Sequence, residues 1–242
     1  MRILFFLFSI VFSASAFAGE RVLVFAAASQ RDAMMEIGGL YEEICKCRVV
    51  FSFAATSTLA RQIDAGVDAH AFVSANEAWA DWLQIRGRLN AQSRSVVAGN
   101  RLAIASSSLT KDSLGILLRG QFAMADPVSV PAGIYAREAL ENLGVWQDVR
   151  KNAVFSENVR VALSSVRRGD LLAGIVYLSD LEQAVGVHAH YVFPENTHTP
   201  IHYVAVALKG KQRGLDFVEF LGTEVAQGIF RRFGFLQVSA TN

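Results

Sequence analysis

The chain has 242 residues with a formal net charge of +1, and 52% of its residues are hydrophobic, enough for a sizeable buried core. The near balance of 23 basic and 22 acidic side chains disfavours a protein that binds nucleic acid or an anionic membrane surface. The length suits one large or two modest domains.

Residues 1–18 have the pattern of a secretory signal peptide. Arg2 is the only charge before the apolar run Ile3–Phe12, and Ala16-Phe17-Ala18 is a small-x-small cleavage site. The apolar run is too short to span a membrane. We therefore expect cleavage after Ala18, with no cysteine at that point to carry a lipid anchor, and export of a soluble periplasmic protein.

Short apolar strands alternate with amphipathic helices along the rest of the chain. The strands are expected at Arg21–Ala26, Arg48–Phe53, Ala71–Ser74, Arg101–Ala105, Phe122–Ala125, Val154–Phe155, Ala173–Tyr177, His190–Phe193 and Ile201–Leu208. The helices are expected at Ser29–Cys45, Thr58–Ala65, Glu77–Ile85, Leu114–Leu118, Ala132–Leu143, Val159–Arg168, Gly214–Leu221 and Thr223–Phe233. The alternation predicts an α/β architecture with parallel sheets, and the lack of a flexible tether means that two domains would share crossing strands.

Small or hydroxyl residues line four of the strand-to-helix junctions. These are FAAAS at Phe25–Ser29, AATST at Ala54–Thr58, PAG at Pro131–Gly133 and SENV at Ser156–Val159. For any one junction, a hydroxyl that caps its own helix is the ordinary explanation. Ligands of α/β proteins, however, gather outside the carboxyl ends of strands. Four such junctions together therefore predict a pocket of backbone N–H groups and hydroxyls that binds an anion.

The same junctions indicate what kind of anion would fit. Asp126 and Glu157 are the only carboxylates near them. A site made of donors alone suits a fully deprotonated anion, because an anion that keeps a proton needs an acceptor. Sulfate-like or molybdate-like dianions are therefore expected rather than hydrogen phosphate. Tyr177 closes the strand GIVY, where its hydroxyl is either a further donor to the pocket or a satisfied group of the core.

The remaining reactive side chains leave alternatives open. Cys45 and Cys47 lie at a helix-to-strand turn, either as thiols or as a local disulfide. A metal is conceivable at Tyr135 with Tyr177, or on the solvated strand face expected to carry the histidines His188, His190, His198 and His202. A secreted hydrolase is the other alternative. The chain has no G-x-S-x-G, H-E-x-x-H or glycine-rich phosphate loop, so Ser29 could act as a nucleophile only beside a buried histidine.

Six segments of the chain resemble the periplasmic molybdate-binding proteins of ABC transporters. They are VFAAAS at Val24–Ser29, STLARQIDAG at Ser57–Gly66, ADPVSVPAGIYAREAL at Ala125–Leu140, ENVRVAL at Glu157–Leu163, GIVYLSD at Gly174–Asp180 and FRRFGF at Phe230–Phe235. The likeness covers essentially the whole mature chain in the expected order. It implies a monomeric, non-enzymatic binding protein that captures molybdate, and also tungstate, and delivers it to a transmembrane permease without any cofactor.

The resemblance also implies a fold and a site. The fold is the two-lobed periplasmic binding protein fold of type II, in which each lobe is a mixed or parallel sheet flanked by helices. Lobe one would be residues 20–100 plus 205–242, and lobe two 101–204. The implied oxyanion ligands are the hydroxyls of Ser29, Thr56 and Tyr177 and the backbone N–H groups of Ala132 and Val159. The alternative to a molybdate-binding protein is a binding protein for another ligand, such as sulfate or a metal ion.

Overall fold

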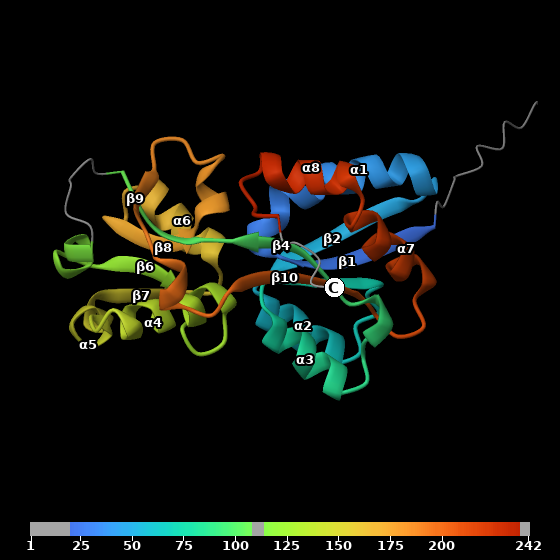
Figure 1. Cartoon of the computed structure of the whole chain (residues 1–242), viewed down its shortest axis with the longest axis horizontal. Coiled ribbons are helices and arrows are strands. Elements are labelled where there is room, and N and C mark those ends of the chain that lie inside the picture. Colours follow the sequence, from blue (N-terminus) through green and yellow to red (C-terminus); the bar gives the residue numbers. More distant parts are fainter. Residues whose placement is uncertain (1–19, 108–113, 238–242) are drawn as a thin grey trace, which may run out of the picture.

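The computed structural model describes residues 20–107 and 114–237, so the expected signal peptide at residues 1–18 lies outside the described residues. Two α/β lobes lie side by side, and two crossing segments of the chain join them (Figure 1). Each lobe is built on one five-stranded sheet. Within the described ranges, no helix is long and apolar enough to cross a membrane.

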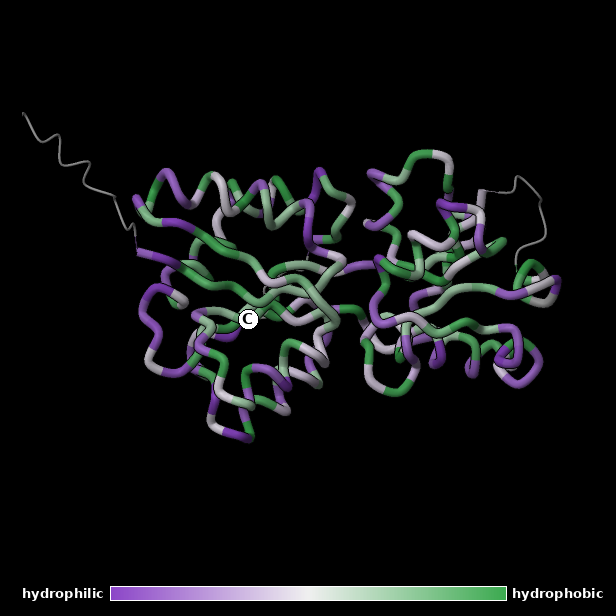
Figure 2. Tube along the Cα trace, turned by 180° about the vertical axis from the view of Figure 1, so that it is seen from behind, coloured by the Kyte–Doolittle hydropathy of each residue, from purple (hydrophilic) through white to green (hydrophobic). Residues whose placement is uncertain are grey.

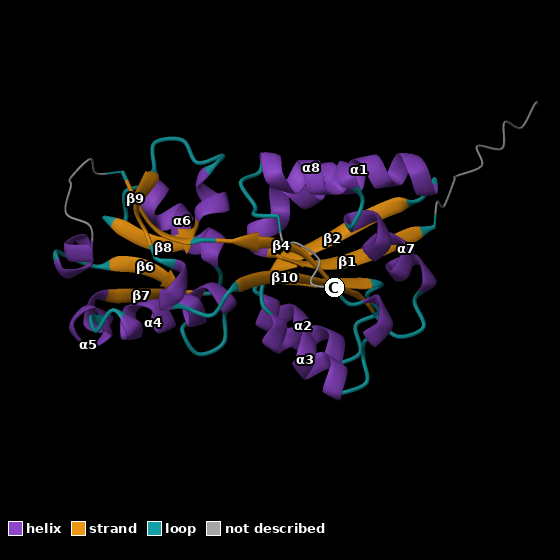
Figure 3. Ribbon diagram, viewed as in Figure 1, coloured by secondary structure: helices purple, strands orange, loops and turns teal. Residues whose placement is uncertain are grey.

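The first lobe contains the strands β1 (Arg21–Ala27), β2 (Arg48–Ala54), β3 (Ala71–Ser74), β4 (Ser95–Asn100) and β10 (Ile201–Ala207). Their order in the sheet is β2-β1-β3-β10-β4. β1 runs parallel to β2 and β3, whereas β10 is antiparallel to both of its neighbours. The helices are α1 (Arg31–Cys45), α2 (Thr56–Asp64), α3 (Glu77–Ile85), α7 (Gln212–Leu221) and α8 (Glu224–Arg232). α1 and α8 cover one face of the sheet, and α2 and α3 the other (Figure 3).

The second lobe repeats this plan with the strands β5 (Leu102–Ser106), β6 (Phe122–Ala125), β7 (Ala153–Ser156), β8 (Ala173–Tyr177) and β9 (His188–Val192). Their order is β7-β6-β8-β5-β9. β6 is parallel to β7 and β8, and β5 is antiparallel to β8 and β9. The helices α4 (Pro131–Asn142), α5 (Trp146–Val149) and α6 (Val159–Arg167) complete the lobe, with α4 and α6 on opposite faces.

Apolar strands form the middle layer of both lobes, and the polar residues lie on the outer helix faces and loops (Figure 2). The central strands are buried on both faces, which explains their continuous apolar runs. Val204, Ala205, Val206 and Ala207 of β10, for example, have no exposed surface. The apolar runs that identify these strands in the sequence are therefore the residues that the two sheets bury.

The expected strands and helices are all present, with shifts of a few residues at their ends. Prediction missed β4 and the short α5. β4 was missed because only three of its residues, Val96–Ala98, form a continuous apolar run, between Ser95 and Gly99. Of the mixed or parallel sheets that the resemblance implies, both are mixed, because one strand that follows a crossing between the lobes, β10 in the first and β5 in the second, runs antiparallel to its neighbours.

Two local features of the first lobe refine the expectations. β10 pairs with the first sheet from Ile201 onward, so we place the second lobe boundary before this strand rather than after residue 204. Cys45 and Cys47 form a disulfide that closes the turn after α1, with Lys46 between them in the left-handed region at φ 52°. The sequence left open whether these cysteines are free thiols or a local disulfide, and in the structure they form the disulfide.

Candidate functional site

A small cavity lies where the two lobes meet. Its lining comes from the helix starts that follow β1, β2, β6 and β7, and from the ends of β3 and β8: Ala27, Ala28, Ser29, Ala54, Ala55, Thr56, Ala75, Val130, Pro131, Ala132, Asn158, Val159 and Tyr177. The cavity has a volume of about 20 Å³. A cavity of this size has room only for a small occupant and not for a sugar or a peptide.

All five residues that the sequence selects lie on this cavity. Ser29 and Thr56 come from the first lobe, and Ala132, Val159 and Tyr177 come from the second. None of them is more than 4% exposed. The structure therefore brings together residues that are up to 148 positions apart in the chain.

The residues that line the cavity include the first residues of helices, whose backbone N–H groups have no acceptor within the helix. Helix α4 begins with Pro131, which has no N–H, and its second residue, Ala132, offers the first amide. In α6, the Asn158 side chain accepts the N–H groups of Arg160 and Val161, at 3.0 and 3.1 Å, but not that of Val159. The first amides of both helices thus remain available, at the positive ends of the helix dipoles.

The hydroxyls at the first two junctions do not cap their own helices, so the ordinary explanation fails at both. Ser29 lies in a 3₁₀ turn before α1, and its Oγ is 3.0 Å from the Tyr203 hydroxyl. Thr56 is the first residue of α2, whose N-cap is Ala55. Its Oγ1 accepts the Ala75 N–H at 3.1 Å, so its own proton is free to be donated elsewhere.

The Tyr177 hydroxyl has no hydrogen-bond partner in the described part of the chain, although the residue is only 1% exposed. Burial holds the pKa of Tyr177 well above its ordinary value, so the phenol keeps its proton. A buried hydroxyl without a partner costs about 1–3 kcal/mol, a cost that an acceptor in the cavity would remove. This atom is the clearest sign that the cavity is built for an occupant.

The cavity lining contains no ionisable side chain other than Tyr177. Asp126 and Glu157, the carboxylates nearest in sequence, are not part of it. The Asp126 carboxylate instead accepts the N–H groups of Val128 and Ser129, both at 2.9 Å. The polar character of the lining is therefore that of neutral hydrogen-bond donors.

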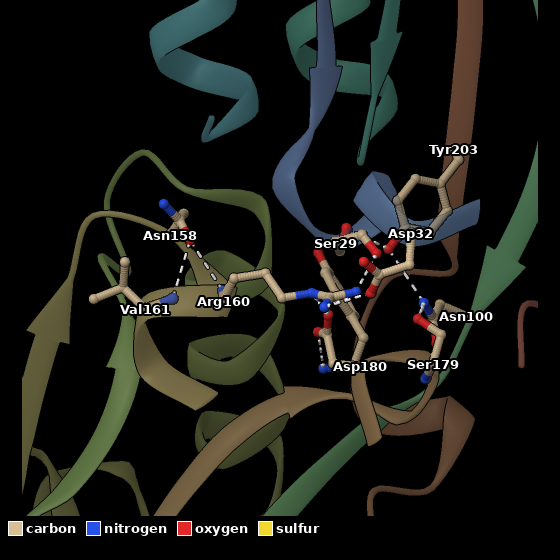
Figure 4. A network of polar contacts seen from close by, with 10 residues as sticks. Ser29, Asp32, Asn100, Asn158, Arg160, Val161, Ser179, Asp180 and Tyr203 are labelled. Atoms are coloured by element: carbon tan, nitrogen blue, oxygen red, sulfur yellow. Dashed lines mark hydrogen bonds and ion pairs between the residues drawn. The ribbon is translucent and has the colours of Figure 1, made fainter. Parts of the chain in front are cut away.

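A charged network that sequence analysis missed lies next to the cavity (Figure 4). Arg160, on the first turn of α6, pairs with Asp180 at 2.7 Å in its own lobe and with Asp32 of α1 at 2.8 Å in the other lobe. It also donates to the Ser29 carbonyl at 3.2 Å. A cation such as Arg160 is unfavourable at the start of a helix, beside the positive end of the helix dipole. Its position in the first turn of the predicted helix is the signal in the sequence that could have indicated a carboxylate partner from elsewhere in the chain.

Burial is the main influence on Asp180, whose side chain has no exposed surface. It raises the pKa of this carboxyl to about 6, although the Arg160 guanidinium and the Tyr177 N–H act to lower it. Burial acts to lower the pKa of Arg160, but the carboxylates of Asp180 and Asp32 together raise it, so the guanidinium stays charged. Near neutral pH the pair is ionic and bridges the two lobes through Asp32.

The other candidates from the sequence lie outside the cavity. The described residues contain no group of three or more His, Cys, Asp or Glu that could hold a metal ion. Tyr135 packs against the ring of His198 instead of lining the cavity, and His202 pairs with Glu77 at 2.9 Å. Ser29 has Tyr203, and not a histidine, as its side-chain partner. Neither the metal site nor the serine nucleophile is formed by these residues.

Comparisons with known proteins agree over nearly the whole chain. Residues 22–236 match the family of bacterial extracellular solute-binding proteins. The chain is 36% identical to the molybdate-binding protein ModA of Escherichia coli over 94% of its own length and 93% of that protein. It is 34% identical to ModA of Haemophilus influenzae over 90% of its own length and 91% of that protein. The periplasmic molybdate-binding protein of Azotobacter vinelandii superimposes with a TM-score of 0.81 at 22% identity, over 90% of this chain and 100% of that one.

Proposed function

Since this chain belongs to the bacterial extracellular solute-binding proteins, and among them to the molybdate-binding family, we propose that it captures molybdate in the cavity between its lobes. It would then deliver the anion, from the periplasm, to the membrane permease of an ABC transporter. The observation that carries this proposal is the cavity lined by neutral donors, in which the buried Tyr177 hydroxyl lacks a partner.

Hydroxyls and backbone N–H groups together form the donor set of the proposed complex. The hydroxyls of Ser29, Thr56 and Tyr177 and the backbone N–H groups of Ala132 and Val159 surround the anion. The N–H groups of Ser29 and Thr56 add to this set. An oxyanion loses much solvation when it is buried, so nearly every oxygen must receive hydrogen bonds. Donors from both lobes supply them, and no counter-charge is needed within the cavity.

The polarity of the cavity supports an anion over a metal cation. A cation site would show converging carboxylate or tyrosinate oxygens, whereas the lining offers N–H and O–H groups and no carboxylate. Among oxyanions, a donor-only site favours those that carry no proton. Molybdate and tungstate share charge, shape and nearly the same size, so we propose that both are bound. Sulfate has the same charge but is smaller.

Binding and closure of the lobes are linked in this proposal. The anion contacts donors of both lobes at once and therefore has its full affinity only in the closed state. Contacts that join the lobes include Arg160 with Asp32, and the Trp79 indole N–H with the Ser129 carbonyl at 2.9 Å. Ligand binding would shift the population toward the state in which both lobes contact the anion.

Isothermal titration calorimetry with molybdate, tungstate, sulfate and hydrogen phosphate tests the proposed function. We expect tight binding of molybdate and tungstate at one site per chain. Sulfate should bind more weakly, and hydrogen phosphate more weakly still. Sulfate binding as tight as that of molybdate would refute the ligand assignment.

Replacing Tyr177 by phenylalanine should weaken molybdate binding without weakening the ligand-free protein. The lost hydroxyl costs affinity, about 1–3 kcal/mol for a hydrogen bond to a charged group. The ligand-free protein should be as stable as before or slightly more stable, because this hydroxyl has no partner in the described chain. Calorimetry and urea unfolding measure the two effects. A parallel loss of both would contradict the role of Tyr177 as a ligand.

The Thr56 hydroxyl can be tested with a matched pair of variants. Thr56→Ala should cost about 1–3 kcal/mol of molybdate affinity, as should Ser29→Ala, because each removes a donor to a buried dianion. Thr56→Ser keeps the hydroxyl and serves as the control, with affinity close to that of the unsubstituted protein. If the serine variant binds as weakly as the alanine variant, the methyl group and not the hydroxyl matters.

A further inference from the structure

The Ser29 hydroxyl is held by a buried tyrosine that does not itself line the cavity. Tyr203 lies on β10, has no exposed surface and places its Oη 3.0 Å from Ser29 Oγ (Figure 4). No other side-chain hydrogen bond of Ser29 occurs in the described part of the chain. Either oxygen could be the donor of this bond, so its direction depends on what else binds Tyr203.

The orientation of the Asn100 side chain decides this direction. Its Oδ1 accepts the backbone N–H of Arg101 at 2.9 Å and that of Ser179 at 3.4 Å. Backbone N–H groups are always donors, so the oxygen of the carboxamide must face them. The Nδ2 therefore faces the other way, 2.7 Å from Ser179 Oγ and 3.1 Å from Tyr203 Oη. Asn100 donates to Tyr203.

The proton of Tyr203 then has one destination among the described residues. The phenol oxygen accepts from Asn100, and Ser29 Oγ is the only other polar atom bonded to it. Burial raises the pKa of Tyr203 well above its ordinary value, so the proton stays on the phenol. Ser29 consequently accepts from Tyr203, and its own proton is left to point toward the cavity that the residue lines.

We propose that Tyr203, oriented by Asn100, is a positioning residue that fixes the Ser29 hydroxyl as a donor to the bound anion and so contributes to the rejection of oxyanions that keep a proton. A serine hydroxyl without such a partner can turn and accept, which would satisfy the O–H of hydrogen phosphate. Thr56 is fixed in the same sense by the Ala75 N–H. This inference rests on the proposed function of the cavity.

Tyr203→Phe removes the donor that orients Ser29. Molybdate affinity should fall about tenfold, because the Ser29 hydroxyl is no longer held as a donor. The ratio of molybdate to hydrogen phosphate affinity should fall by a similar factor. This affinity ratio is measured as the phosphate concentration that displaces half of the bound molybdate. Tyr41→Phe is the matched control, since Tyr41 packs against Phe217 and Phe220 and does not line the cavity.

Asn100→Asp inverts the direction of the network with little change in shape. The carboxylate still accepts the Arg101 N–H but now also accepts from Tyr203, whose oxygen then accepts from Ser29. Ser29 would present a lone pair to the cavity. At mildly alkaline pH, molybdate and hydrogen phosphate carry the same double charge, so repulsion by the new carboxylate cancels in the affinity ratio. We expect this ratio to fall further than in Tyr203→Phe, by more than about tenfold.

The outcomes separate the two proposals. If the unsubstituted protein does not bind molybdate, the proposed function fails and this inference fails with it. If it binds molybdate tightly and both variants keep the unsubstituted affinity ratio, only the positioning role of Tyr203 is overturned. Thermal melting shows whether each variant is folded, and Asn100→Asp carries the test alone if the phenylalanine variant does not fold.

Discussion

Arg160→Met should destabilise the folded protein by about 3–5 kcal/mol near neutral pH, the usual cost of removing one partner of a buried ion pair. The Asp180 carboxylate has no exposed surface, and without Arg160 the one hydrogen bond left to it among the described residues would be that from the Tyr177 N–H at 3.2 Å. The variant also loses the link to Asp32 that crosses between the lobes. Molybdate affinity should fall as well, because the closed state loses that contact.

The loss of stability in Arg160→Met should increase with pH, because the Asp180 carboxyl loses its proton as the pH rises. Its pKa in the folded protein is about 6, above the ordinary 3.8, and removal of Arg160 raises it further. Between the unfolded and folded pKa values, the folded protein holds a proton that the unfolded chain lacks. Stability therefore falls as the pH rises through that window. Urea unfolding should show a large deficit of Arg160→Met at pH 8 and a smaller one near pH 5.

Two further variants control this experiment. Arg160→Met combined with Asp180→Asn should recover most of the stability, because no buried charge is left uncompensated. Arg168→Met breaks the exposed pair with Asp170 and should change stability by less than about 0.5 kcal/mol. A deficit of Arg160→Met that is the same at both pH values would contradict the role assigned to the buried carboxylate.

Gly133→Ala should abolish tight molybdate binding and cost about 3 kcal/mol or more of stability, at or beyond the upper end of the usual overpacking range. A Cβ on Gly133 would lie 2.3 Å from the carbonyl oxygens of both Ala125 and Asp126, which are backbone atoms and cannot rotate away. Helix α4 would have to move off β6, and the adjacent Ala132 N–H would move with it. Displacement of one donor weakens the whole donor set, because the anion must contact all of them at once.

Gly39→Ala is the matched control for this substitution. Gly39 lies in α1, where an added Cβ would meet nothing within 4 Å. The exchange should raise stability by about 0.5–1 kcal/mol through helix propensity and leave molybdate affinity unchanged. Urea unfolding and calorimetry compare the two variants. Unsubstituted affinity in Gly133→Ala would show that the close approach of α4 to β6 does not position the site.

Much of the fold and of the candidate site could be predicted from the sequence, because those features are local. Long apolar runs and helical periodicity identify strands and helices, as in β10, and fail where the apolar run is short, as in β4. The chemistry of a junction is also local. Small residues at Ala132-Gly133 and hydroxyls at Ser29 and Thr56 mark helix starts that can offer donors, and the structure places all of them on one cavity except Gly133, which packs against β6.

What the sequence determined was therefore the set of strand-to-helix junctions and the types of donor that they carry. Only the tertiary structure decided the strand order, the antiparallel course of β5 and β10, and the partners of the site residues. Ser29 meets Tyr203 at a separation of 174 residues, and Arg160 meets Asp32 at 128. No periodicity reports such pairings, because the first depends on how β10 returns to the first sheet and the second on how the two lobes dock. The direction of each hydrogen bond depends in turn on those neighbours.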